Sequence, residues 1–132
     1  MIVVDACVVA NALVDDHAAG NAARARLRGE ELAAPDLVMV ETAAVLRGLW
    51  LSRQISQERH SEAVIALETL PMELAPTRLF LKRGYSLRHN VTSYDSCYIA
   101  LAEILQCPLV TADARMAQTP GATCNFEVLT DE

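Results

Sequence analysis

Two acidic residues interrupt the apolar faces of expected helices. The residues three and four positions from Glu41 are Leu, Val, Ala and Val, and none is a Lys or Arg that could pair with it. Asp95 has Val, Thr, Tyr and Ile at the same spacing. Because acidic side chains are almost never fully buried unless they are paired or bound to a metal, both positions indicate a polar site. Two alternatives stay open: Glu41 could reach solvent from the stripe edge, and Asp95 could complete a capping box with Thr92.

Two further acids directly follow short apolar runs that are typical of strands. Asp5 follows Ile2-Val3-Val4, and Asp113 follows Leu109-Val-Thr-Ala. In parallel sheets, functional sites form at the carboxyl ends of the strands, which is where these two residues would lie. Each could instead cap the helix that comes next. Taken together, the pattern predicts that four carboxylates converge at one site: Asp5, Glu41, Asp95 and Asp113.

Converging carboxylates require something that relieves their mutual repulsion. Two carboxylates about 4 Å apart repel by roughly 4 kcal/mol at an effective dielectric near 20, which is a large share of a small domain's stability. Protons or a cation can remove this cost. Oxygen ligands favour Mg²⁺ or Mn²⁺, and no His or Cys has the spacing of a zinc site. Divalent ions on carboxylates are typical of phosphodiester hydrolysis, in which they activate water and stabilise the attacking and leaving oxygens.

The elements that would position these acids alternate between strand and helix. Strands are expected at 2–4, 32–34, 72–75, 108–111 and 125–129, and helices at 8–14, 16–29, 36–53, 56–70, 77–88 and 92–106, with a helical turn at 114–118. Asp36 and Ser56 are the expected caps of the third and fourth helices. This alternation predicts a mostly parallel sheet with helices on both faces. Since there is no repeat, linker or compositional break, residues 1–132 are expected to form one α/β domain.

Composition and charge narrow the class of protein further. With 52% hydrophobic and 21% charged residues, the chain is expected to be globular. No apolar run reaches the roughly 18 residues of a membrane span, so we expect a cytoplasmic protein without membrane association. A net charge of −6 argues against binding nucleic acid by bulk charge, although two divalent ions would bring −6 to −2. Four cysteines are expected to be buried free thiols: Cys7, Cys97, Cys107 and Cys124.

Other enzyme classes have little support in the motifs. There is no Gly-x-Ser-x-Gly elbow and no phosphate-binding loop of the G-x-x-x-x-G-K-[ST] type. Five basic residues flank the second half of the acidic set and are candidates for RNA phosphate contacts: Arg78, Lys82, Arg83, Arg88 and Arg115. The alternative for each of them is a solvated helix face.

The four acids lie in short segments that occur in a fixed order along nearly the whole chain. The segments are Val3-Val4-Asp5-Ala6-Cys7-Val8-Val9, Pro35-Asp36-Leu37-Val38-Met39-Val40-Glu41, Ser93-Tyr94-Asp95-Ser96-Cys97-Tyr98-Ile99-Ala100-Leu101-Ala102 and Leu109-Val110-Thr111-Ala112-Asp113. In this order they resemble the PIN-domain nucleases, and among them the VapC-type toxins of bacterial toxin–antitoxin pairs. The resemblance implies a single-domain, three-layer α/β/α sandwich with a mostly parallel central sheet.

The resemblance also implies an activity and partners. It implies a Mg²⁺-dependent endoribonuclease in which Mn²⁺ can substitute, and in which metal-activated water hydrolyses RNA. The metal ligands would be the four acids, Asp5, Glu41, Asp95 and Asp113, holding one or two ions. A homodimer and a cognate antitoxin whose chain end covers the acidic pocket are further expectations.

Two positions near the acids bear on catalysis. Thr111 matches the family's hydroxyl in the strand-end T-x-D, where it would orient an acid or a metal-bound water, although a β-branched strand residue is the plain alternative. Cys7 departs from the family, which usually has Ser or Asn two residues after the first Asp. A thiol is a much weaker hydrogen-bond partner than a hydroxyl. Cys7 therefore favours the alternative function, a catalytically weak or inactive PIN-like module that binds protein.

Overall fold

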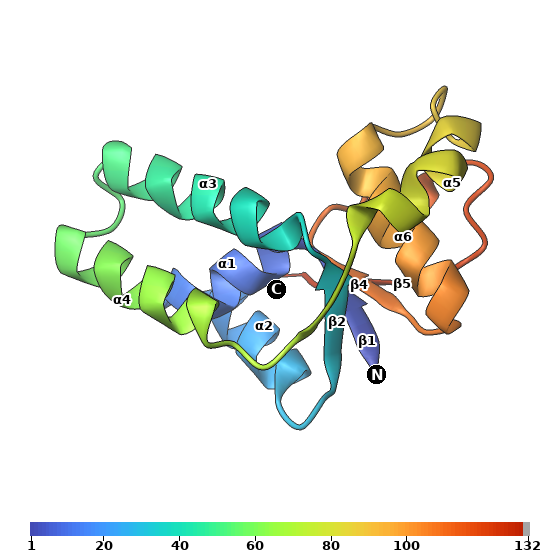
Figure 1. Cartoon of the computed structure of the whole chain (residues 1–132). Helices are drawn as coiled ribbons and strands as arrows, with labels where there is room; N and C mark the ends of the chain where they lie inside the picture. The colour runs from blue at the N-terminus through green and yellow to red at the C-terminus, as the bar shows by residue number, and fades with distance from the viewer. Residues whose placement is uncertain (131–132) are drawn as a thin grey trace.

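A five-stranded parallel sheet forms the centre of the molecule (Figure 1). The computed structural model describes residues 1–130, and the strand order is β3-β2-β1-β4-β5. The strands are β1 (Ile2–Val4), β2 (Leu32–Pro35), β3 (Glu73–Ala75), β4 (Leu109–Thr111) and β5 (Phe126–Val128). Every neighbouring pair is parallel, and β1 lies in the middle between β2 and β4. The carboxyl ends of β1, β2 and β4 are therefore adjacent along one edge of the sheet.

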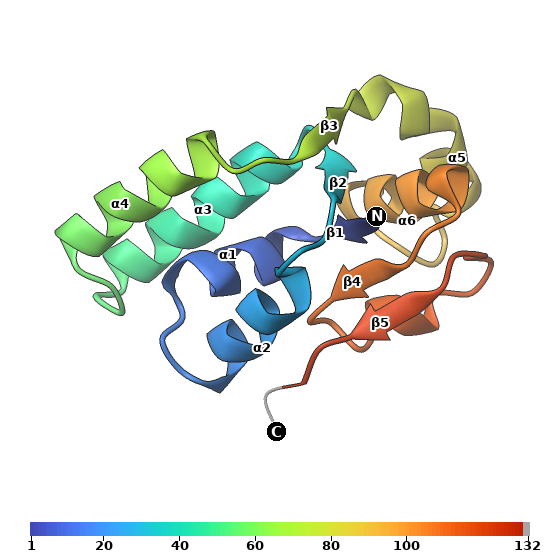
Figure 2. The same ribbon diagram turned by 90° about the horizontal axis from the view of Figure 1, so that it is seen from below.

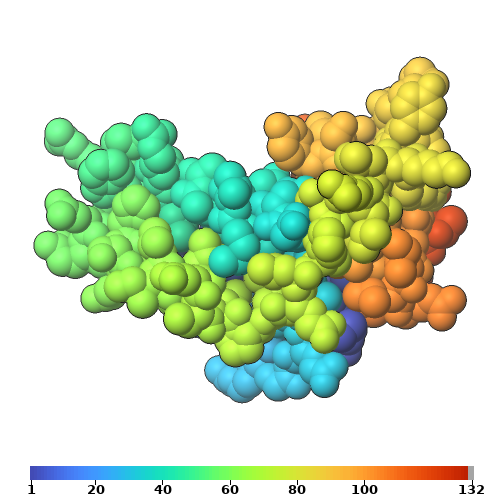
Figure 3. All heavy atoms as spheres, in the orientation of Figure 1, coloured from blue at the N-terminus to red at the C-terminus, as the bar shows by residue number. Residues whose placement is uncertain are grey.

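Helices cover both faces of this sheet, which confirms the three-layer α/β/α class (Figure 2). The helices are α1 (Ala6–Val14), α2 (Ala18–Leu27), α3 (Val38–Leu51), α4 (Gln57–Glu68), α5 (Leu81–Ser86) and α6 (Ser93–Leu105). Helix α1 packs against α2, α3 and α4 on one side, while α6 packs against α5 and the strands on the other. Helices α3 and α4 form a pair that extends away from the sheet (Figure 3). None of the helices in the described part of the chain is long and apolar enough to cross a membrane.

Several helix boundaries and one helix cap depart from the expected ones. The segment expected as one helix at 77–88 is a 3₁₀ turn, η1 (Thr77–Phe80), followed by the short α5. Helix α2 begins at Ala18 rather than Asp16. The expectation that Asp36 caps α3 is wrong, because its carboxylate accepts a hydrogen bond from the Thr77 N–H at 3.2 Å and so ties the two chain segments together. The helical turn expected at 114–118 is the shorter 3₁₀ turn η2 (Met116–Gln118).

Two capping predictions are confirmed. The Ser56 hydroxyl accepts a hydrogen bond from the Arg59 N–H at 3.0 Å at the start of α4. The Thr92 hydroxyl does the same for the Asp95 N–H at 3.2 Å at the start of α6. Each bond satisfies one of the donors that the first turn of a helix leaves unpaired, so both helices begin where local side-chain chemistry allows.

The cysteines are all free, but the prediction that they are all buried is wrong. Cys97 is buried, Cys107 and Cys124 are half-buried, and Cys7 is exposed. Cys7 lies in the first turn of α1, directly after the central strand, where the helix begins at the edge of the sheet and not inside it. Its neighbours Ala6 and Val8 are buried, so Cys7 is on the solvent side of this first helical turn.

Candidate functional site

The topology brings all four predicted acids to the carboxyl edge of the sheet. Asp5 directly follows β1, and Asp113 lies two residues after β4. Glu41 is in the first turn of α3, which follows β2. Asp95 is in the first turn of α6, and a crossover helix that leads into a parallel strand begins at this same edge.

Asp5 is the most buried of the four and is held from two sides. Only 7% of its surface is exposed. One carboxylate oxygen accepts the Val8 N–H at 2.9 Å, so the capping role that the sequence allows is present in the structure. The other oxygen accepts the hydroxyl of Thr111, which in turn accepts the Asp113 N–H at 3.0 Å. Thr111 thus connects the ends of β1 and β4 and orients the Asp5 carboxylate.

The charge of the neighbouring acids acts on Asp5 in addition to its burial. Burial raises the pKa of the Asp5 carboxyl, while its hydrogen bonds with Thr111 and Val8 oppose this shift. The charges of Asp95 and Asp113 raise the pKa further. Asp95 and Asp113 are therefore within electrostatic range of Asp5.

Glu41 is half-buried and is bound by a tyrosine that the pattern of acids does not reveal. The hydroxyl of Tyr98 donates a hydrogen bond to the Glu41 carboxylate at 2.7 Å. Tyr98 is 1% exposed, and its pKa is raised by burial and then by the hydrogen bond and charge of Glu41. A buried tyrosine hydroxyl needs a polar partner, and Tyr98 lies three residues after Asp95 on one side of a helix. This spacing of three residues is the sequence signal that could have identified Tyr98 as part of the site.

The environment of Glu41 matches the stripe-edge alternative. The fully buried residues of α3 are Val38, Thr42 and Leu46. Glu41 lies beside this buried face of the helix and not in the middle of it. Burial raises the pKa of Glu41, the Tyr98 hydrogen bond lowers it, and the charge of Asp95 raises it again. Glu41 therefore lies at the boundary between core and solvent, within electrostatic range of Asp95.

Asp95 is also half-buried, and its backbone N–H donates the capping hydrogen bond to the Thr92 hydroxyl. The pKa of Asp95 is raised by burial and by the charge of Asp113, and is lowered by a hydrogen bond with Thr92. The capping alternative is thus realised in part. This capping role does not exclude Asp95 from the acidic site, because the charge of Asp113 still acts on its carboxylate.

The negative charges of all four acids act on the thiol of Cys7. Partial burial raises the pKa of its thiol, and the charge of Asp5 raises it further, followed by smaller effects of Asp113, Asp95 and Glu41. The thiol is therefore protonated and neutral near pH 7. As a weak donor, it supports the neighbouring carboxylates less than a hydroxyl would.

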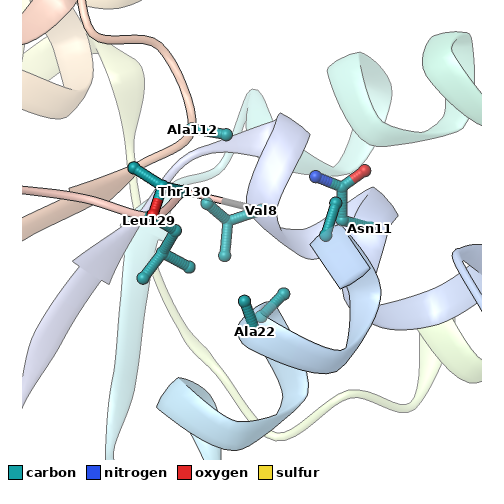
Figure 4. A pocket seen from close by; sticks show the side chains of 8 residues that line it. Val8, Asn11, Ala22, Ala112, Leu129 and Thr130 are labelled. Carbon is teal, nitrogen blue, oxygen red and sulfur yellow. The ribbon is translucent and has the colours of Figure 1, made fainter. Parts of the chain in front are cut away.

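Beside the acids lies a small pocket of about 250 Å³ between α1, α2 and the ends of β4 and β5 (Figure 4). Val8, whose N–H binds Asp5, and Ala112, which precedes Asp113, contribute to its lining. Figure 4 also shows Asn11, Ala22 and Leu129 around the same space. The pocket therefore adjoins the acidic site but contains none of its carboxylates.

Comparison with known proteins agrees with this arrangement. A family model described as PIN domain matches residues 2–122. The chain belongs to the PIN-domain family. "Ribonuclease VapC1" of Mycobacterium tuberculosis is 38% identical over 128 residues, which cover 96% of each chain. "Ribonuclease VapC12" of the same species is 36% identical over 129 residues, covering 98% of this chain and 99% of the relative. These relatives confirm the resemblance to VapC-type proteins that the four segments indicate.

A solved structure shows the same fold as this PIN domain. The crystal structure of PAE2754 from Pyrobaculum aerophilum superimposes with a TM-score of 0.60 at 22% sequence identity. The match covers 93% of this chain and 89% of the other. At this level of identity, the likeness concerns the arrangement of strands and helices.

The donor atoms of this PIN domain fit a hard divalent cation. All four acids offer carboxylate oxygens, which suit Mg²⁺ and Mn²⁺. Within residues 1–130, no three His, Cys, Asp or Glu side chains are already gathered as ligands of one ion. Mg²⁺ commonly takes one or two protein carboxylates and keeps several waters, so such a gathering is not required. The raised pKa values of Asp5, Glu41 and Asp95 are those of acids that a cation would stabilise in ionised form.

The five basic candidates have different surroundings in the PIN domain. Arg83 is occupied internally: it donates two hydrogen bonds to the Glu103 carboxylate at 2.8 and 2.9 Å and one to the Gly121 carbonyl. The Arg83 hydrogen bonds hold the pKa of Glu103 down to about 2.

The other four basic candidates are not held in this way. Arg115 lies 3.6 Å from the Asp113 carboxylate, and Arg88 stacks on the ring of Tyr85. Arg78 and Lys82 are exposed and form no ion pair with residues 1–130.

Proposed function

We propose that this PIN domain is a Mg²⁺-dependent endoribonuclease, the toxin of a toxin–antitoxin pair, and that Mn²⁺ can replace Mg²⁺. The observation that carries the proposal is the placement of Asp5, Glu41, Asp95 and Asp113 along one edge of the sheet, with mutual repulsion that a cation would relieve. The VapC relatives, named ribonucleases, support RNA as the substrate. The toxin would act in the cytoplasm, as a homodimer, and be restrained by a cognate antitoxin.

In this proposal the chain's residues position a metal and its substrate. The four acids would hold one or two ions, which supply an activated water and stabilise the charged oxygens of the phosphodiester. Thr111 fixes the orientation of Asp5, and Tyr98 fixes that of Glu41. Arg78, Lys82, Arg88 and Arg115 remain available to contact RNA phosphates, whereas Arg83 is committed to Glu103.

The metal requirement gives the direct test. Purified protein is expected to cut single-stranded RNA in Mg²⁺ or Mn²⁺, and to stop when EDTA is added, because the acids alone cannot activate water. Gel analysis of a labelled oligoribonucleotide measures this. A preparation of Asp5→Asn made in parallel controls for contaminating nucleases. Cleavage that persists in EDTA and is absent from the Asp5→Asn preparation would contradict the metal mechanism.

The second candidate function is a PIN-like module with weak or absent catalysis that works by binding protein. Cys7 favours it, since the thiol gives Asp5 little support. Retention of four mutually repelling acids opposes it, because protein binding alone gains nothing from that repulsion.

Cys7→Ser tests whether the thiol limits or supports RNA cleavage in the first candidate function. We expect the variant to cleave RNA as fast as the wild type or faster, because a hydroxyl can both donate to and accept from the groups beside Asp5. Initial cleavage rates at saturating Mg²⁺ measure the effect, with Cys124→Ser as a control thiol outside the acidic site. A hundredfold loss of rate with an unchanged melting temperature would show that the thiol itself is needed.

A further inference from the structure

The pocket between α1, α2 and the ends of β4 and β5 adjoins the acids and has no role in the proposed cleavage. Its volume is about 250 Å³, which is below the roughly 300 Å³ at which pockets for drug-sized ligands begin. Val8 and Ala23 in its lining are buried, whereas Ala112 is exposed. The pocket therefore has a buried floor and an open rim, with room for one small chemical group.

Three parts of the pocket wall are tied to the acidic site. The Val8 N–H donates to the Asp5 carboxylate at 2.9 Å. The Leu129 N–H donates to the carbonyl oxygen of Thr111 at 2.8 Å, and the Thr111 hydroxyl donates to Asp5. Ala112 is the next residue after Thr111. The pocket is thus held in a fixed position beside the carboxylate of Asp5.

The lining of the pocket carries no charged side chain. It consists of four alanines, Val8 and Leu129, with Asn11 and Thr130 as its polar members. A phosphate or a guanidinium group that entered would lose its hydration without gaining an ionic partner. An uncharged group with apolar faces is therefore the kind of ligand that this lining favours.

Asn11 adds an unpaired polar group to the apolar lining. Among residues 1–130, the half-buried side-chain amide of Asn11 takes part in no hydrogen bond. Figure 4 shows Asn11 beside the space that Val8, Ala22 and Leu129 surround. An amide offers both donors and an acceptor, so it matches a ligand edge on which a donor lies next to an acceptor.

A nucleobase combines these properties and can reach the pocket from the acids. It has apolar faces, and its edge carries the donors and acceptors that proteins read. Asn11 follows Asp5 by six residues, which is about 9 Å along the axis of α1. This distance is within the span of one nucleotide. A strand whose phosphate lies at the acids can therefore place the base of a neighbouring nucleotide in the pocket.

We propose that this pocket binds the base of one unpaired nucleotide next to the RNA bond that is cut, and that the Asn11 amide reads its edge. The inference rests on the proposed function, since it takes the same RNA as its ligand. The faces of the base lie against the alanines of α2 and against Leu129. A base within a duplex has its edge paired, so the pocket selects unpaired RNA.

The base preference of cleavage tests the role of Asn11. A single-stranded RNA pool with randomised positions is cut in Mg²⁺, and the ends of the products are sequenced. Wild-type protein is expected to prefer one base about tenfold at one position next to the cut, as a single bidentate contact between a side chain and a base allows. Asn11→Leu keeps most of the side-chain volume but has no amide, and should cut with similar rates whichever base stands there.

Filling the pocket gives a second test that needs no cleavage. Ala22→Leu places a larger side chain in the pocket, and should weaken the binding of labelled single-stranded RNA in EDTA about tenfold by excluding the base. Ala25→Leu is the matched control, because Ala25 is exposed on the same helix and does not line the pocket. Fluorescence anisotropy measures binding, and thermal melts show whether each variant is folded.

Several results would overturn the base pocket. They are cleavage by the wild type without a base preference, an unchanged preference in Asn11→Leu, and equal RNA binding by Ala22→Leu and Ala25→Leu. The Asn11→Leu result decides the proposal if Ala22→Leu does not fold. RNA binding that only Ala22→Leu weakens, in a wild type that does not cleave in Mg²⁺, would remove the nuclease activity and leave the base pocket standing.

Discussion

Replacing Asp95 by Asn is expected to abolish RNA cleavage while leaving the metal-free protein as stable as the wild type or more stable. The substitution removes a carboxylate whose pKa is raised by burial and by the charge of Asp113, so it removes repulsion. The cap of α6 survives, because the Thr92 hydroxyl accepts its hydrogen bond from the backbone N–H of residue 95, which asparagine keeps. Loss of one metal ligand accounts for the loss of cleavage.

Mg²⁺ should stabilise the wild type more than the Asp95→Asn variant. An ion at a hundred times its dissociation constant stabilises a protein by about 2.7 kcal/mol, and Asp95→Asn should gain much less than the wild type. Thermal melts with Mg²⁺ and with EDTA measure both quantities. If Asp95 served only the helix N-terminus, the variant would lose roughly 0.3 to 1 kcal/mol with or without metal and would keep its activity. That outcome would remove Asp95 from the site.

The pH dependence of the same melts has a defined sign. A carboxyl whose pKa is raised by folding contributes stability that is fully present below its unfolded value and is lost as the pH rises through its folded value. For Asp95 this loss begins near the ordinary value of 3.8 and ends above its raised folded pKa. Metal-free wild type should therefore lose more stability than Asp95→Asn as the pH rises through this interval.

Thr111→Val is expected to reduce cleavage by about 10- to 100-fold and to destabilise the protein by about 1–3 kcal/mol. The Thr111 side chain is fully buried, and its hydroxyl both donates to Asp5 and accepts from the Asp113 N–H. Valine fills the same space but leaves both groups without this partner, which costs the desolvation of buried polar atoms. The effect on activity follows because residues that orient metal ligands typically contribute this much to affinity or rate.

Thr42 provides a matched control for this substitution. It is also fully buried, but its hydroxyl has no hydrogen-bond partner within the described residues. Thr42→Val should therefore be neutral or stabilising, and should leave cleavage unchanged. Denaturant unfolding and initial cleavage rates measure both variants, and Thr111→Ser, which keeps the hydroxyl, should retain most of the activity. Equal effects of the two valine substitutions would contradict the role of Thr111.

The elements and the four acids were largely predictable because their signals are local. The alternation of apolar runs with helical spacing depends on neighbouring residues, and it indicates both the parallel sheet and its helices. Asp5 and Asp113 directly follow apolar runs, so both are predicted at strand ends for any order of the strands in the sheet. The largest departure is at 77–88, where the expected single helix is a 3₁₀ turn to Phe80 followed by the short α5.

The contacts that complete the site were decided only by the tertiary structure. Thr111 meets Asp5 across 106 positions of sequence, and Tyr98 meets Glu41 across 57. Both contacts depend on β1 lying between β2 and β4, an order that no local pattern specifies. Arg83 likewise turns from a candidate RNA contact into a partner of Glu103, because α5 packs against α6. Sequence alone thus determined which residue types stand at the edge of the sheet, while the strand order and helix packing determined which of them touch.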